Sequence, residues 1–159
     1  MRAGRMAVAS AAVVVMWALP AASLDAGYPV AATLTGIAVP HDGHDVRFGS
    51  VQIRLRGIAA PEDYRGNREV GGPEATRHLA GLVDGREVTC HLDDTTAGRS
   101  PVGICFLDGE DIGALQVRAG HARDCPAFSG GRYVAVEAEA RAAGRDLSRI
   151  YPLPDYCEP

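Results

Sequence analysis

The sequence predicts a mainly β protein with helices, of the α+β class, built as a closed five-stranded Greek-key barrel with about three helices. Two patterns carry this prediction: short apolar runs with a period of two, and amphipathic runs at helical spacing that begin and end at turn residues. We expect strands at residues 30–39, 46–48, 51–58, 87–92 and 101–107 and helices at 73–83, 111–119 and 132–143. Five strands with a helix between the third and the fourth are typical of a barrel of the OB type.

The third predicted strand shows the period most clearly. Val51, Ile53 and Leu55 alternate with Gln52, Arg54 and Arg56, which gives one apolar and one polar face. The segment from Glu62 to Gly72 is polar and rich in glycine, which predicts an exposed loop. The prolines of the tail at 150–159 argue against regular structure there.

Residues 1–23 resemble a secretory signal peptide. Two arginines precede an uncharged apolar run at 6–19, and small residues follow Pro20, with cleavage expected after Ala22 or Ser23. The alternative is a retained membrane anchor, which the length of the run and Pro20 disfavour. We therefore expect residues 24–159 to form one domain in the periplasm or outside the cell, monomeric and without membrane contact.

The composition limits the classes of partner. All 16 basic residues are arginine, and without Arg2 and Arg5 the mature chain has 14 arginines against 20 acidic residues, a net charge of −6. Broad, charge-driven binding of nucleic acid normally needs a basic face. A local arginine cluster in a cleft, taking nucleic acid or a nucleotide phosphate, remains compatible with this balance.

The four cysteines predict two disulfides, because an even number in an exported chain is typical of such bridges. Three pairings exist. Cys90 and Cys105 lie in successive predicted strands and can face each other across a hairpin, and Cys125 and Cys157 would then attach the C-terminal tail to the body. A metal site is the alternative, but the sequence contains no CxxC pair.

Five motifs occur in order between about residues 33 and 122: DG-x-x-VRF, VQIRLRGIAAPE, GPEA, AGRSPVG and DIGALQVRAGHA. Together they resemble the thermonuclease (staphylococcal nuclease-like) family. The resemblance implies an OB-fold barrel with helices and a calcium-dependent phosphodiesterase that acts on DNA and RNA. The motif positions imply that Arg54 and Arg99 bind phosphate and that Glu62 is the general base or positions water. Two guanidinium groups suit the charge that develops on a phosphoryl transition state.

The calcium ligands that the resemblance implies are replaced. His44 and Ala59 stand where the family has aspartates, and calcium prefers six to eight oxygen ligands. One reading is a pseudoenzyme that keeps the barrel, and the sequence favours it. A second is a transition metal held by His44 with Asp45 or Glu62, since imidazole suits zinc, manganese or nickel. A third is slow hydrolysis without a metal.

Overall fold

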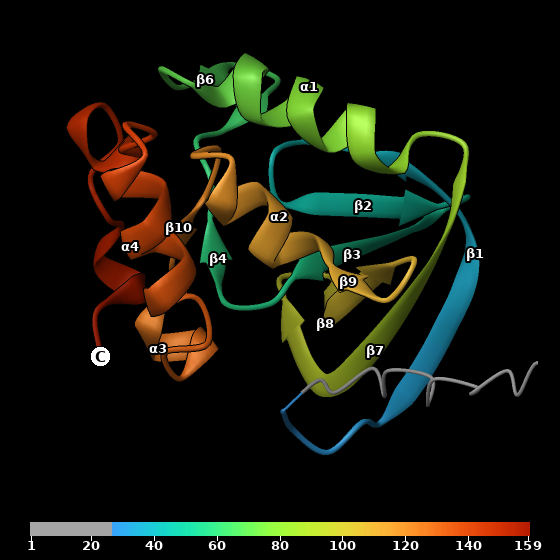
Figure 1. Ribbon diagram of the computed structural model, residues 1–159. Coiled ribbons are helices and arrows are strands. Elements are labelled where there is room, and N and C mark those ends of the chain that lie inside the picture. Colours follow the sequence, from blue (N-terminus) through green and yellow to red (C-terminus); the bar gives the residue numbers. More distant parts are fainter. Residues whose placement is uncertain (1–26) are drawn as a thin grey trace, which may run out of the picture.

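The computed structural model describes residues 27–159, so the predicted signal peptide at 1–23 lies outside the described residues. Five strands form a closed barrel in the order β3-β2-β1-β7-β8, which confirms the predicted OB-fold α+β class (Figure 1). The strands are β1 (Ala32–Pro40), β2 (Asp45–Phe48), β3 (Val51–Leu55), β7 (Arg86–Ala97) and β8 (Ser100–Leu107). Neighbouring strands are antiparallel except β3 and β8, whose parallel pairing closes the barrel.

Among the described residues the structure has four α-helices, where the sequence predicted about three. They are α1 (Gly72–Val83), α2 (Ile112–Arg118), α3 (Pro126–Ser129) and α4 (Val134–Ala142). The α3 helix was missed because it is a single turn, with a proline at its start. Helix α1 crosses one face of the barrel, and α2 lies between the barrel and α4 (Figure 1). Asp111 caps α2, since its carboxylate accepts a hydrogen bond from the backbone N–H of Ala114.

The third strand is shorter than predicted. It ends at Leu55 because Gly57 adopts a positive φ of 74°, which turns the chain out of the barrel. Residues Ile58–Ala59 then form a separate strand, β4, which pairs with β10 (Arg123–Asp124). The prediction that strand 51–58 is continuous was therefore wrong, and this departure carries the chain toward the C-terminal helices.

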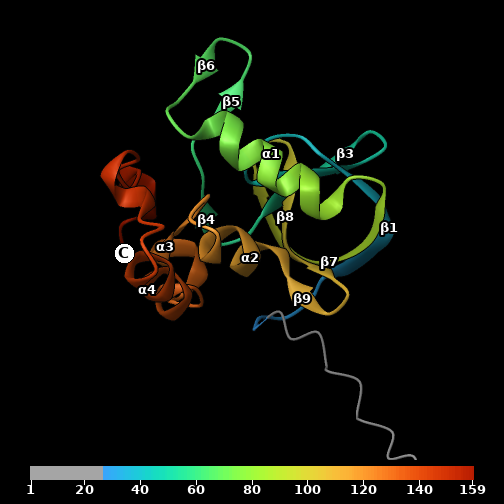
Figure 2. The same ribbon diagram turned by 45° about the horizontal axis from the view of Figure 1, so that its top comes forward.

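Two further segments are more regular than the sequence predicted. The loop after Glu62 contains a small hairpin of β5 (Asp63–Tyr64) and β6 (Asn67–Arg68), which projects beyond the start of α1 (Figure 2). Strand β7 continues beyond its predicted end at Leu92 to Ala97, with a register irregularity between Leu92 and Thr96. A short strand β9 (Glu110–Asp111) extends the sheet beside β8.

The buried apolar side chains form two clusters. The larger one fills the barrel and packs it against α1 and α2, and it includes Ile53, Leu79, Val88 and Ile112. The smaller one lies under the tail and contains Ala59, Cys125, Leu147, Tyr151 and Cys157. The tail itself folds into two 3₁₀ turns, Leu147–Arg149 and Asp155–Cys157. It is thus an integral packing element despite its prolines.

Both predicted disulfides are present. Cys90 and Cys105 are directly opposed in the β7–β8 ladder, and their bridge crosses it. Cys125 is bonded to Cys157, which attaches the tail to the start of α3. Such bridges are typical of proteins in a non-reducing, extracellular environment.

Within residues 27–159, none of the helices has the length and apolar character that crossing a membrane requires.

Candidate functional site

A tight loop between β1 and β2 brings three polar residues, Asp42, His44 and Asp45, into the protein interior, each at most 5% exposed. The carboxylate of Asp42 accepts a hydrogen bond from the backbone N–H of His44 at 2.9 Å, which is an Asx turn. Gly43 allows this loop to approach α1 closely. A Cβ atom at Gly43 would lie 2.7 Å from that of Ala75.

Replacing Gly43 by alanine is therefore expected to destabilise the fold by about 1–3 kcal/mol, because the added methyl group overpacks the contact with α1. Gly81 is the matched control, since a Cβ atom there meets nothing within 4 Å. Gly81→Ala lies inside α1 and is expected to be neutral or to stabilise by up to about 1 kcal/mol. Urea denaturation of both variants measures the difference, and equal effects would contradict the close packing of this loop.

The imidazole of His44 faces three carboxylates. Its Nε2 atom lies 3.6 Å from Asp42 Oδ1, 3.7 Å from Asp45 Oδ2 and 3.7 Å from Glu62 Oε1. These separations exceed the 2.7–3.2 Å or so of a hydrogen bond. They are near the roughly 3.4 Å that separates donor atoms sharing one tetrahedral metal ion, given metal–ligand bonds of about 2.1 Å. We refer to Asp42, His44, Asp45 and Glu62 as the acidic cluster.

The donor set of the acidic cluster fits a transition metal better than calcium. One nitrogen lies at its centre, and imidazole together with carboxylate oxygens suits zinc, manganese or nickel. Two buried atoms of the cluster, Asp45 Oδ1 and His44 Nδ1, have no hydrogen-bond partner of good geometry among the described residues. The Ala60 backbone lies close enough to His44 to favour its protonated form, but this effect is smaller than that of burial. Gln52 donates a hydrogen bond of 3.1 Å to the other oxygen of Asp45 and so orients that carboxylate.

Burial sets the protonation states inside the acidic cluster. It lowers the pKa of His44 to about 3, with a further contribution from the charge of Arg54, so the imidazole is neutral and free to bind a cation. Burial and the neighbouring Asp42 raise the pKa of Asp45 to about 8. Burial and then Asp42 also raise the pKa of Glu62, whose side chain is 32% exposed and forms the open side of the cluster.

We expect the metal-free protein to lose stability between about pH 6.5 and 8. In this window the unfolded chain has released the Asp45 proton, whereas the folded chain still binds it, so the free energy of unfolding falls by up to about 1.4 kcal/mol per pH unit. Below pH 6.5 the lowered pKa of His44 opposes this slope, because there the unfolded state binds the extra proton. Urea denaturation in EDTA across this range measures the fall.

The Asp45→Asn variant is the control for this slope, because its amide does not titrate. It should keep a constant free energy of unfolding from pH 6.5 to 8 while the wild type declines. An identical decline in both proteins would show that Asp45 is not the group responsible.

Arg54 stands beside the acidic cluster. It is the ladder partner of Asp45 across β2 and β3, so both side chains project from the same side of the sheet. Its side chain is partly exposed and makes neither a hydrogen bond nor an ion pair with a described residue. It nevertheless acts through its charge on His44, Asp45 and Glu62. A guanidinium so placed is available for an anion beside the cluster.

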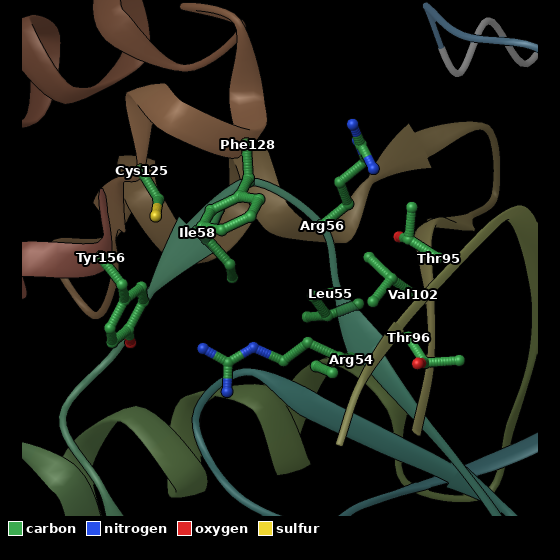
Figure 3. Close-up of a pocket in the computed structure, with 12 residues that line it drawn as sticks. Arg54, Leu55, Arg56, Ile58, Thr95, Thr96, Val102, Cys125, Phe128 and Tyr156 are labelled. Carbon is green, nitrogen blue, oxygen red and sulfur yellow. The ribbon is translucent and has the colours of Figure 1, made fainter. Parts of the chain in front are cut away.

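A mainly apolar pocket of about 480 Å³ opens next to Arg54. Leu55, Ile58, Phe128 and Tyr156 line it, and Figure 3 shows the Arg54 side chain extending toward Tyr156, while Arg56 points the other way. The rings of Phe128 and Tyr156 are about half exposed, with centroids 6.5 Å apart. Exposed aromatic rings beside an arginine can hold a planar ring whose attached anion reaches the guanidinium.

Two further positions that the sequence singled out are not members of the acidic cluster. Arg99 is exposed in the turn between β7 and β8, and its side chain makes no hydrogen bond or ion pair within the described part of the chain. Ala59, which replaces an expected ligand, is fully buried and packs in the tail cluster. The adjacent Ala60 instead lies against the Asp42–His44 loop, 3.1 Å from a Cβ atom built on Gly43.

The sequence did not predict that two further residues belong to this region. Asp42 was not counted as a ligand, although an Asx turn two residues before His44 aims its carboxylate inward. The Asp-Gly pair was the available signal. Tyr156 is the second: it lines the pocket because its neighbour Cys157 is bonded to Cys125, so the predicted bridge was the available signal.

Known protein-family profiles and curated proteins contain no match to this chain.

Proposed function

We propose that this chain is an exported, thermonuclease-like phosphodiesterase that cleaves nucleic acid with a divalent transition metal in place of calcium. The observation that carries the proposal is the acidic cluster beside Arg54, with one neutral imidazole nitrogen 3.6–3.7 Å from three carboxylates. The order of the motifs around Arg54 and Glu62 supports the family assignment.

In the proposed reaction, phosphate binding, water activation and metal binding fall to different residues of the site. The Arg54 guanidinium would bind two oxygens of the scissile phosphate and offset the charge of the transition state. Glu62 lies at the open side of the cluster, and burial raises its pKa toward the range in which a carboxylate is an effective general base for water. His44, Asp42 and Asp45 would hold the metal, which when bound supplies Lewis-acid stabilisation of the phosphoryl oxygen.

The pocket would take the nucleoside next to the scissile phosphate. Stacking of one base on Phe128 or Tyr156 contributes about 1–3 kcal/mol in proteins that bind single strands. Such stacking requires an unpaired base, so it favours single-stranded over duplex substrate. The net negative charge of the chain agrees with a local, rather than an extended, contact with the polyanion.

A non-catalytic binding module is the second candidate, and the sequence ranks it first. Two observations favour it: the Arg99 side chain makes no hydrogen bond or ion pair with a described residue, and Ala59, where the resemblance implies a metal ligand, packs in an apolar cluster. Such a module would use Arg54 and the pocket to bind a nucleotide or a single strand, with the acidic cluster serving only the fold.

A cleavage assay separates the two candidates. The oxidised, metal-free protein is incubated with a labelled single-stranded oligonucleotide and manganese, zinc, nickel, calcium or EDTA. We expect cleavage with at least one transition metal, none in EDTA, and a loss of at least 100-fold in Glu62→Gln. Folded protein that cleaves with no metal, or a Glu62→Gln variant of unchanged rate, would refute the enzyme.

Calcium provides an independent readout of the same site. Millimolar calcium should barely raise the melting temperature, whereas micromolar zinc or manganese should raise it, because only a bound ion stabilises the folded state. A shift of several degrees with calcium would show that the cluster provides the oxygen ligands after all.

A further inference from the structure

Two histidines outside the acidic cluster lie against each other. His78 belongs to α1, and His121 follows α2. Their ring centroids are 4.7 Å apart, the ring planes are inclined by 36°, and both residues are only partly buried. Neither residue has a role in the proposed phosphodiesterase.

A fully buried glutamine fixes the tautomer of His78. The Nε2 atom of Gln116 donates hydrogen bonds to the backbone carbonyls of Gly43, at 2.7 Å, and Ala75, at 3.2 Å. Its Oε1 atom is therefore the one that faces His78 Nδ1 and can only accept a hydrogen bond. In the neutral imidazole of His78 the proton therefore lies on Nδ1, and the lone pair of Nε2 is the one that can bind a cation.

This arrangement matches the support that metal-binding histidines usually have. A ligating imidazole generally donates its other N–H to a carbonyl or carboxylate, which orients the ring and raises its basicity. His121 is also prepared for ligation, since burial and then the proximity of His78 lower its pKa and favour the neutral imidazole.

We propose that His78 and His121 form a second cation site, which takes a borderline divalent ion such as Cu²⁺, Ni²⁺ or Zn²⁺. Two imidazoles that share one ion through bonds of about 2.0–2.1 Å have ring centres roughly 4.5–5 Å apart, and the observed separation of 4.7 Å lies in that range. A site with only imidazole donors selects these ions over calcium and magnesium.

Glu74 would supply a third ligand only after its side chain turned toward the two imidazoles, since its carboxylate does not now form one close group of donor atoms with them. It lies one turn before His78 on α1, at the i, i+4 spacing that places two side chains on one face, and its charge acts on His121. At present it accepts a hydrogen bond from Arg77 at 2.8 Å. Both partners of that ion pair are exposed, so exchanging Arg77 for a metal ion costs little.

Copper binding tests the proposal with Cu²⁺ as the probe. Calorimetry should find two sites in the oxidised wild type, and one in His121→Gln, in His78→Gln and in His44→Gln. In His44→Gln, the electron paramagnetic resonance spectrum should show coupling to two nitrogens. His91→Gln, which removes another partly buried histidine, should still bind two ions. Circular dichroism checks the fold of each variant. If His44→Gln does not fold, the comparison of copper stoichiometry between the wild type and His121→Gln tests the proposal by itself.

Unchanged stoichiometry in both His78→Gln and His121→Gln would overturn the proposal, as would a spectrum without nitrogen coupling in His44→Gln. These outcomes do not depend on the phosphodiesterase. A protein that binds copper at the histidine pair but cleaves nothing refutes only the enzyme, and an active enzyme without this second site refutes only the inference.

Discussion

Replacing Arg54 by alanine is expected to lower kcat on a single-stranded oligonucleotide by about 100- to 1000-fold, the usual effect of removing one group that stabilises a charged transition state. Arg54 is the arginine that acts electrostatically on three members of the acidic cluster and also lines the pocket. Rates at saturating metal, with KM measured separately, give this value.

Two other arginines serve as controls for the expected loss of kcat in Arg54→Ala. Arg47 lies exposed on the neighbouring strand β2, and Arg47→Ala should leave kcat unchanged. Arg99→Ala should raise KM severalfold and change kcat by less than tenfold, because its side chain is exposed in a turn and makes no ion pair within the described residues. Equal losses of kcat in the Arg47 and Arg54 variants would mean that net charge alone, and not position, drives the reaction.

Replacing both Cys125 and Cys157 by serine is expected to lower the free energy of unfolding by about 3–4 kcal/mol, because the bridge closes a loop of 32 residues. For a chain of this size that loss corresponds to a fall in melting temperature of about 10–20 °C. The tail cluster of Leu147 and Tyr151 also loses the attachment that buries it. Thermal unfolding of the oxidised proteins measures the change.

The Cys90→Ser/Cys105→Ser variant is the matched control. Its bridge spans 15 residues, so the stability loss should be similar, at about 3 kcal/mol. It lies in the barrel wall, however, and does not position Tyr156. At a temperature where both variants are folded, only the loss of the Cys125–Cys157 bridge should weaken binding of a single strand. Equal weakening in both would show that the tail does not form the pocket wall.

The barrel followed from local patterns because each of its strands carries its own signal. The alternation from Val51 to Leu55 places Ile53 inside and Arg54 outside regardless of what surrounds the strand. The opposed cysteines of the β7–β8 hairpin were predictable for the same reason, since hairpin neighbours in sequence are also neighbours in space.

The residue at which β3 ends and the chain leaves the barrel wall was less predictable. Residues 51–58 form one run with strand-like alternation, and Gly57 divides it. Its φ is positive, and a Cβ atom there would lie 2.8 Å from the backbone of Ser129. That contact joins residues far apart in the chain. No local sequence pattern indicates the contact between Gly57 and Ser129, so the prediction of one strand over residues 51–58 was wrong at Gly57.

The sequence by itself determined the fold class and the two disulfides and singled out Arg54 and Glu62 as candidate site residues, because period, spacing and residue chemistry are local properties. Only the tertiary structure decided what surrounds His44. The loop, strand β2 and the segment after Pro61 converge there, and burial together with neighbouring charges shifts the pKa values of His44, Asp45 and Glu62. The stretch in which the resemblance implies aspartate ligands thus holds a buried imidazole that faces three carboxylates.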